Sequence, residues 1–533
     1  MAFPSIRWPG AKKDSASLPP GSVHQVASNA MGEVEQTELK RAITTRQFVF
    51  MAFGGTIGAG LLIGSYVALK VAGPGSVFIG FTIAGVCITA LMGSLGELSS
   101  AFPTSGSFYD YSIRFISPSW GFAMGWNYIM NYILTVPLEL TVMNLVAKFW
   151  NKNIHAAILI PIFIVCLIVI SFRGAKWYGE AEHAFGILKI FMLVTFSLAA
   201  IVVATGGVST DPRHGTHFSY WENGKAFKSG AAGFLYVFVA AGLAYGGTEI
   251  LGLAAAECQH PEKTMPLAYK IVAVRIVLCY LIPLFMMGLI VGDSTFILFP
   301  KKASLFVISM KQAGISVLPD IFNAIILVAV FSMANSCVFA SSRALRAMCA
   351  RGMGPKILAK TRNGTPMNAL VVVFIVSLLA FINVAPAGDV IFDWLLALAS
   401  ASNFFTWLSI SVSHIRLRMA IKKQGLDPKD VLGWVSPMGI PGSIVTIIIC
   451  LAGLISLIVT AAIPPAGLDR GSEPGSLIIV RHALGIAIVF CFWFGHICFS
   501  LWKKREHPLL IPLDQINLSK TDTAVKFEES TSN

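Results

Sequence analysis

The sequence predicts an all-α polytopic membrane protein with twelve transmembrane helices, and three observations support this prediction. Hydrophobic residues make up 55% of the 533 residues, and the mean hydropathy is +0.72. Charged residues make up 13%, about half the share of roughly 25% in soluble domains. Apolar runs of about 20 residues, long enough to cross a bilayer as helices, recur along the chain. We therefore expect one integrated helical bundle.

The apolar runs divide the chain into a bundle with a polar tail at each end. We expect residues 1–46 to form a disordered N-terminal tail, residues 47–502 the twelve-helix domain, and residues 503–533 the C-terminal tail. The lipid bilayer is then the main surrounding of the domain. The predicted spans are 47–69, 75–99, 120–148, 155–172, 183–205, 231–257, 270–293, 320–349, 367–386, 388–415, 440–462 and 480–502.

The distribution of basic residues predicts how the bundle is oriented. The net charge is +13, and 27 of the 40 Lys and Arg residues fall in the two tails and in alternate loops. Cytoplasmic loops of membrane proteins carry such an excess. We therefore expect both tails to be cytoplasmic and the positive charge to reflect topology. A nucleic-acid partner is not expected.

A glycine-rich stretch, Gly54–Gly60, interrupts the first apolar run. Four of its seven residues are glycine, which weakens a helix in the place where lipid offers its backbone no hydrogen bonds. Two interpretations follow. The small-xxx-small pairs Gly54/Gly58 and Gly60/Gly64 suit close helix packing. Alternatively, the helix unwinds here and exposes backbone amides and carbonyls to a small charged ligand.

A second glycine-rich stretch, Gly242–Gly252, favours the unwinding interpretation. It interrupts the sixth span, which corresponds to the first if spans 1–5 and 6–10 are two repeats of opposite orientation. Interrupted helices at matching positions of inverted halves indicate the substrate site of a secondary transporter. The half-helix after the first break begins near Ala59, where free amides suit a carboxylate, and carbonyls near Ile57 and Leu243 suit an ammonium group.

Charged residues inside the spans are functional candidates because their burial is costly. We single out Glu97 in the second span, Lys189 in the fifth and Glu249 beside the second glycine-rich stretch. Each could serve proton coupling, or could form a structural ion pair. Glu139, in the third span, could simply tie helices together.

Several motifs together resemble the fungal amino acid permeases, in the yeast amino acid transporter group of the amino acid–polyamine–organocation superfamily. The resemblance covers about residues 38–430. The matching stretches are GGTIGAGL (54–61), GEL (96–98), FPTSGSF (102–108), GWNY (125–128), PLEL (137–140), GTE (247–249), GLAAAE (252–257), NAL (368–370) and WLSISVSHIR (407–416).

This resemblance implies a LeuT-like fold of 5+5 inverted repeats plus two C-terminal helices. It also implies proton-coupled import of amino acids, usually across the plasma membrane. The scattered cysteines and histidines indicate no metal site, and we expect no cofactor. Lys189 matches a lysine thought to replace sodium. Residues Leu243-Ala244-Tyr245 depart from the Phe-Ser-Phe that is frequent in the family, which affects side-chain selectivity. The implied substrate-binding residues are Thr56, Ile57, Gly58, Ala59, Gly60, Leu243, Ala244, Tyr245 and Gly246.

Two other functions fit parts of the sequence. An amino acid sensor would keep the same fold, but the tails are short for a signalling protein. A transporter of a polyamine or a choline-like amine would leave the amides near Ala59 without a carboxylate to bind. An enzyme is not expected, because the sequence lacks a recognisable nucleophile–base set or metal-ligand cluster. We expect a neutral or broad range of amino acids, since the sequence does not name the substrate.

Overall fold

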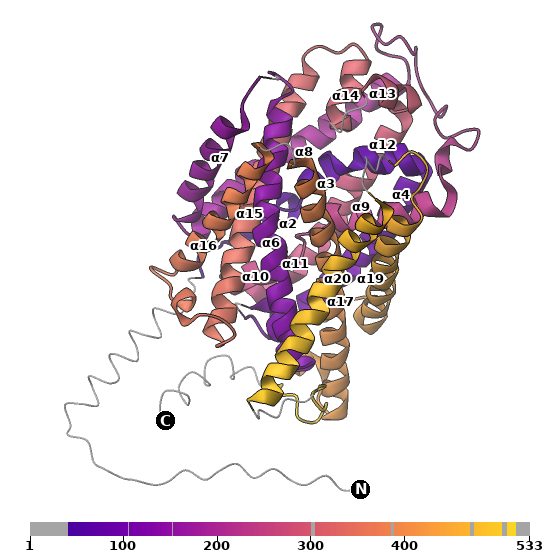
Figure 1. Ribbon diagram of the computed structural model, residues 1–533. Coiled ribbons are helices and arrows are strands. Elements are labelled where there is room, and N and C mark those ends of the chain that lie inside the picture. The colour runs from indigo at the N-terminus through magenta and orange to yellow at the C-terminus, as the bar shows by residue number, and fades with distance from the viewer. Residues whose placement is uncertain are drawn as a thin grey trace, which may run out of the picture.

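The computed structural model is a bundle of helices (Figure 1). It describes residues 41–104, 106–151, 153–299, 304–384, 388–468, 474–503 and 509–518. Most of the two predicted tails therefore lies outside the described residues. Within the described residues, seven helices are long and apolar enough to cross a membrane, and three shorter apolar helices accompany them. The chain is thus a polytopic helical membrane protein, and the count of twelve spans stays a prediction.

The first predicted span is not one continuous helix. Helix α2 (Thr45–Gly54) starts with a capping box in which Thr44 and Gln47 exchange hydrogen bonds, and it ends inside the glycine-rich stretch. After four non-helical residues, α3 (Ala59–Leu62) leads into α4 (Gly64–Ala101). At Gly73, where φ is +81°, the backbone of α4 leaves helical geometry, between the first two predicted spans.

The sixth predicted span is interrupted in the same way. Helix α9 (Gly230–Ala244) ends within the second glycine-rich stretch, and α10 (Ile250–Ala256) begins after a gap of five residues. Gly247 lies in this gap with a φ of +94°. Both interruptions fall where glycine lowers helix stability, as the sequence indicates.

The remaining helices overlap the other predicted spans, with short helices between them. In the first half of the chain these are α5 (Ser107–Phe115), α6 (Pro118–Ala147), α7 (Ala156–Ser171), α8 (Ala175–Ala204) and the 3-10 turn η1 (Lys225–Phe227). In the second half they are α11 (Pro261–Arg275), the π-helical η2 (Ile276–Leu281), α12 (Ile282–Ile290), α13 (Asp293–Leu298), α14 (Leu305–Gln312), α15 (Leu318–Ala350), the 3-10 turn η3 (Lys356–Ala359), α16 (Met367–Ser377), the 3-10 segment η4 (Leu378–Val384), α17 (Gly388–Lys423), α18 (Pro428–Val431), α19 (Gly439–Ala462) and α20 (Gly475–Trp502).

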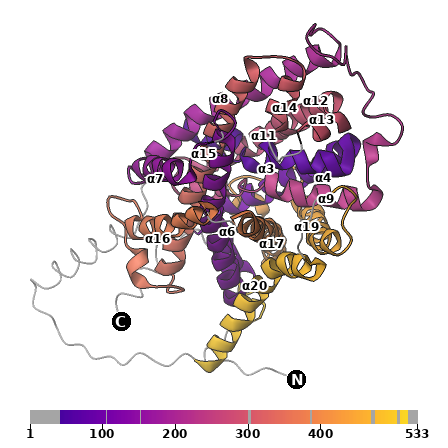
Figure 2. The same cartoon turned by 45° about the horizontal axis from the view of Figure 1, so that its top comes forward.

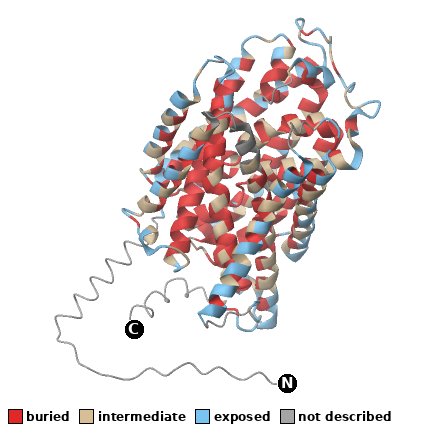
Figure 3. Cartoon of the chain, viewed as in Figure 1, coloured by how far each residue is buried: buried red, intermediate tan, exposed pale blue. Residues whose placement is uncertain are grey.

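Burial separates central helices from peripheral ones (Figure 3). In the most apolar window of α6, 78% of the residues are buried, and in α15 72% are, whereas in α20 only 17% are. Helix α6 packs extensively against α15, and α4 against α9. Exposed apolar side chains on α7, α8 and α20 suit contact with lipid, so α6 and α15 form the centre of the bundle.

Turning the bundle forward shows α13 and α14 gathered at one end (Figure 2). At the other end, residues 509–518 lie against the ends of α5 and α17. The Ile511 amide donates to the Ile116 carbonyl at 2.9 Å, and the Gln424 side chain donates to the Ile516 carbonyl at 2.9 Å. Ile516 itself is buried. We call residues 509–518 the C-terminal strap.

Candidate functional site

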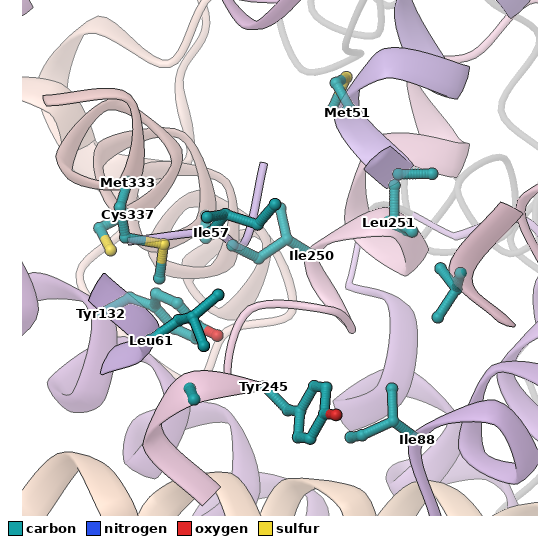
Figure 4. Close-up of a cluster of buried hydrophobic side chains, with 14 of the residues drawn as sticks. Met51, Ile57, Leu61, Ile88, Tyr132, Tyr245, Ile250, Leu251, Met333 and Cys337 are labelled. Atoms are coloured by element: carbon teal, nitrogen blue, oxygen red, sulfur yellow. The ribbon is translucent and has the colours of Figure 1, made fainter. Parts of the chain in front are cut away.

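The two helix interruptions lie at a common cavity. Residues of the first interruption, of the second interruption and of three neighbouring helices line it. Tyr245 and Ile57, from the two interruptions, belong with Ile250 to one cluster of buried hydrophobic side chains (Figure 4). The cavity is lined by Thr56, Gly58, Gly60, Asn131, Tyr132, Thr135, Glu139, Leu243, Gly246, Met333, Ala399 and Asn403.

Five of the nine predicted substrate-binding residues line this cavity, and four do not. Ile57, Ala59, Ala244 and Tyr245 are absent from its lining. Leu243 and Ala244 belong to the last turn of α9, and the second interruption begins after them, at Tyr245. Ala244 still offers a backbone group, because its carbonyl accepts a hydrogen bond from the Tyr280 hydroxyl at 3.0 Å.

Close approach of the two interrupted helices requires glycine at position 60. A Cβ atom placed there would lie 2.8 Å from the Cα of Ala244, and backbone atoms cannot move aside as a flexible side chain can. A side chain at this position would therefore push α3 and α9 apart. The packing and the unwinding interpretations of the first glycine-rich stretch thus both apply, to different glycines.

Lys189 caps the end of α2. Its ammonium group is fully buried and donates to the Gly54 carbonyl at 2.7 Å and to the Ser332 hydroxyl at 2.8 Å. The last carbonyls of a helix lack partners inside the helix and carry partial negative charge. A fixed cation here compensates for the interruption that follows.

Glu182 completes this buried cluster, and the sequence analysis missed it. Its carboxylate accepts hydrogen bonds from the Ser332 hydroxyl at 2.7 Å and from the Asn335 side chain at 3.1 Å. The residue lies one position before the predicted fifth span, so it was assigned to a loop. Its spacing of seven from Lys189, which places both on one face of α8, is the signal that could have found it.

Arg275 is a second buried cation beside the interruptions. One guanidinium nitrogen donates to the Ala52 carbonyl in α2 at 2.9 Å, and another donates to the Thr248 hydroxyl in the second interruption at 2.8 Å. The side chain is fully buried. From α11 it therefore joins both interrupted helices, and with Lys189 it satisfies the carbonyls at the end of α2.

The hydrogen-bond partners of the Glu249 carboxylate are uncharged groups. Its two oxygens accept hydrogen bonds from the Tyr132 hydroxyl at 2.6 Å and from the Trp407 indole at 3.0 Å. These contacts connect the second interruption to α6 and α17. Since both oxygens are satisfied by fixed donors, the geometry favours the structural role for Glu249.

The surroundings of Glu139 differ from those of Glu249, because one of its carboxylate oxygens lacks a donor among the described residues. It is buried and lines the cavity, and its Oε2 has no hydrogen-bond partner among the described residues. The Ala59 amide lies close enough to this carboxylate to interact with it. A buried carboxylate with a free oxygen at the cavity wall is well placed to take up a proton.

Glu97 lies outside the cavity. Glu97 itself is fully buried, and it contacts groups from α17 and from the segment before α19. Its oxygens contact His414 Nε2 at 2.7 Å, Arg418 Nε at 2.8 Å and the Ser436 amide at 2.7 Å. The structure therefore does not bring Glu97 together with the substrate-binding residues, and its contacts join three parts of the bundle.

Tyr245 closes one side of the second interruption. Its ring stacks on Tyr280 with centroids 4.5 Å apart, and its hydroxyl donates to the Phe81 carbonyl at 3.1 Å. Tyr280 in turn lies 3.5 Å, oxygen to oxygen, from the Thr56 hydroxyl at the first interruption. An aromatic pair thus connects the two interrupted helices next to the cavity.

The comparisons with known proteins agree on one protein family. Residues 47–507 match the model of the amino acid permease family. Two relatives from Schizosaccharomyces pombe are an uncharacterized amino-acid permease, 40% identical over 89% of this chain and 81% of its own, and an amino acid transporter, 37% identical over 92% and 84%. A general amino-acid permease of Candida albicans is 38% identical over 88% and 79%.

The extent of these matches confirms the resemblance that the motifs indicated. The family model covers most of the chain, and the relatives align over most of both lengths. The membrane-spanning helices agree with this assignment. The chain therefore belongs to the amino acid permease family and is a fungal-type permease, a membrane transporter rather than an enzyme.

Proposed function

We propose that this permease imports amino acids together with protons, by alternating access around a site between the two helix interruptions. The observation that carries the proposal is the shared cavity: Thr56, Gly58 and Gly60 from the first interrupted helix face Leu243 and Gly246 from the second. Sites of this kind lie near the middle of the membrane in secondary transporters. The inverted 5+5 repeat and the twelve spans are part of the same proposal.

Backbone groups would recognise the part that all amino acids share. The amides between Thr56 and Gly60 suit the substrate carboxylate, and the carbonyls near Ile57 and Leu243 suit its ammonium group. Lys189 places its side-chain nitrogen at the end of α2, 2.7 Å from the Gly54 carbonyl oxygen, which supports coupling that does not need sodium. A zwitterion would then bind without a charged side chain dedicated to it.

Glu139 is the best placed group to carry the coupled proton. Its unpartnered oxygen and its position at the cavity wall mean that a negative charge there would repel the substrate carboxylate. Protonation removes that repulsion, so proton binding and substrate binding favour each other. Release of both on the cytoplasmic side completes the cycle.

The basic loops and the family suggest where the protein works. Both tails would lie in the cytoplasm, because most Lys and Arg residues fall in the tails and in alternate loops. The plasma membrane is the site we propose. Microscopy of a tagged protein, with protease access to each tail from either side, tests this placement.

Uptake by a Gly58→Leu variant tests the site. A Cβ at position 58 would lie 2.8 Å from the Cβ and Cγ of Met333, so leucine would fill the cavity. We expect amino acid uptake to fall at least about tenfold while the protein still reaches the membrane. The matched control is Gly495→Leu in α20, where a new Cβ meets no atom within 4 Å. Normal uptake by Gly58→Leu would exclude this site.

Uptake at different external pH values tests the coupling. We expect wild-type uptake to rise as external pH falls and to persist without sodium. In Glu139→Gln, which is permanently neutral, uptake should lose most of its pH dependence and accumulation against a gradient. A strict sodium requirement, or unchanged pH dependence in Glu139→Gln, would contradict the assignment.

A further inference from the structure

A second cavity lies beside the first, on the side of α20. It is formed between α6, α17 and α20, and it shares Asn131 and Ala399 with the first cavity. A substrate held at the interruptions could therefore extend its side chain past these two residues. The second cavity is lined by Asn127, Met130, Asn131, Leu134, Leu398, Ala399, Ser402, Gly485 and Ile488.

A chain of amide hydrogen bonds fixes the orientation of Asn131. The Asn403 side-chain nitrogen donates to the Gly242 carbonyl at 3.1 Å, which can only accept. The Asn403 side-chain oxygen therefore faces Asn131, whose nitrogen donates to it at 2.9 Å. Because the nitrogen of Asn131 is used in this way, its Oδ1 is the atom left over, and it has no partner among the described residues.

Asn127 supplies a hydrogen-bond donor that complements the acceptor of Asn131. Its Nδ2 also has no partner within the described part of the chain, although the residue is only 5% exposed. Asn127 and Asn131 are four residues apart on α6, so both lie on one face of the helix. The cavity therefore contains a buried donor and a buried acceptor without partners among the described residues, an arrangement that is unfavourable for each group left unsatisfied.

The chemistry of this pair selects a class of side chain. A group that accepts from Asn127 and donates to Asn131 must carry both functions, as a carboxamide does and an aliphatic chain does not. The other described lining residues are apolar, apart from Ser402, and none is charged. An ammonium or guanidinium group would find no carboxylate here, and a carboxylate would find no cation.

We propose that the second cavity binds the carboxamide of a glutamine or asparagine substrate, with Asn127 and Asn131 as the residues that determine selectivity. This inference rests on the proposed function, because the substrate backbone must sit at the interruptions. The substrate amide supplies the hydrogen bonds that these two groups lack among the described residues. Substrates that cannot do so leave both groups unpaired and bind less tightly.

Competition against a labelled amino acid tests the selectivity of the wild-type protein. Glutamine and methionine have similar lengths, but only glutamine carries an amide. We expect glutamine to compete at a concentration about tenfold lower than methionine, and lysine to compete poorly. If methionine competes as well as glutamine, the selectivity proposal is wrong. If no amino acid is taken up at all, the proposed function itself fails, and the proposal fails with it.

A variant of Asn127 tests the residue assignment. In Asn127→Leu the donor is lost, and we expect the advantage of glutamine over methionine to shrink toward one. Asn144→Leu is the matched control, because Asn144 is a buried asparagine of the same helix that lines neither cavity. An unchanged glutamine-to-methionine ratio in Asn127→Leu, with the protein present at the membrane, would overturn the assignment.

Discussion

Arg418 donates two parallel hydrogen bonds to Glu97, from Nε to Oε2 at 2.8 Å and from Nη2 to Oε1 at 2.7 Å. The carboxylate is fully buried and the guanidinium is 13% exposed. Such bidentate, charge-assisted hydrogen bonds are among the strong hydrogen bonds of proteins. It joins α4 to α17 at a distance of 321 residues along the chain.

Removing one partner of this pair should destabilise the folded protein. In Arg418→Met, Glu97 keeps its contacts with His414 and the Ser436 amide but loses its fixed cation, and we expect a loss of about 3–5 kcal/mol in stability. Thermal unfolding of the purified protein in detergent measures it. The double variant with Glu97→Gln should be less destabilised than Arg418→Met alone. A destabilisation equal to the sum of both single changes would show that the pair does not interact.

Replacement of Lys189 by methionine should abolish uptake. The variant leaves the Gly54 carbonyl without its donor and removes the cation near Glu182, so the end of α2 loses the charge that stabilises it. We expect uptake to fall at least about a hundredfold, with a smaller fall in protein level. Labelled amino acid uptake per amount of membrane protein measures this. Lys422→Met, an exposed lysine on α17, is the control and should transport normally.

Tyr245→Phe should be milder than Tyr245→Ala. Phenylalanine keeps the stack on Tyr280 and loses one hydrogen bond to the Phe81 carbonyl, worth about 1 kcal/mol. We expect KM to change less than about fivefold in Tyr245→Phe and much more in Tyr245→Ala. Tyr66→Phe removes a similar hydrogen bond, to the Phe299 carbonyl, outside the cavity. If all three variants behave alike, Tyr245 has no special role at the site.

The ion pair between Asp211 and Arg213 should make the loop after α8 sensitive to acid. Burial alone would raise the pKa of Asp211, but hydrogen bonds and charge from Arg213 outweigh it and hold this pKa below its ordinary value. The ion pair therefore stabilises the loop above the unfolded pKa, and this stability is lost as pH falls through the folded pKa. We expect protease cleavage near residue 211 to increase only below about pH 4.

In Asp211→Asn, cleavage near residue 211 should already be raised at neutral pH and should change little with acid. Asp293→Asn is the comparison, because Asp293 is 62% exposed and pairs with Lys228 at the surface. It should behave like the wild-type protein. Identical cleavage profiles for all three proteins would mean that the Asp211–Arg213 pair does not stabilise the loop.

The sequence predicted the class of fold and both interruptions, because hydropathy and glycine content act locally. The second interruption is shorter than the glycine-rich stretch that predicts it: α9 stays helical through Ala244, and α10 begins at Ile250. The sequence also left Glu182 in a loop, because the predicted span begins at residue 183 whereas α8 begins at Ala175. Boundaries depend on caps and packing, which hydropathy does not record.

The contacts that connect distant residues could not be predicted from one sequence. Asn131 and Asn403 are 272 positions apart, and each looks like an isolated polar residue in an apolar run. The same holds for Arg275, whose partners lie in α2 and in the second interruption. Spacing along the chain identifies residues that share a helix face, but tertiary packing decides which faces meet.

The C-terminal strap has a practical consequence for anyone who attaches a reporter to this protein. Arg114 donates to the Asn517 carbonyl at 2.8 Å, and Lys423 pairs with Asp514 at 3.2 Å, so residues 509–518 belong to the folded bundle. If a fluorescent protein replaced the chain directly after α20, these contacts would be lost, together with the buried side chain of Ile516. The same fusion placed after residue 518 would preserve them, and comparing the two fusions separates the effect of the label from the effect of losing the strap.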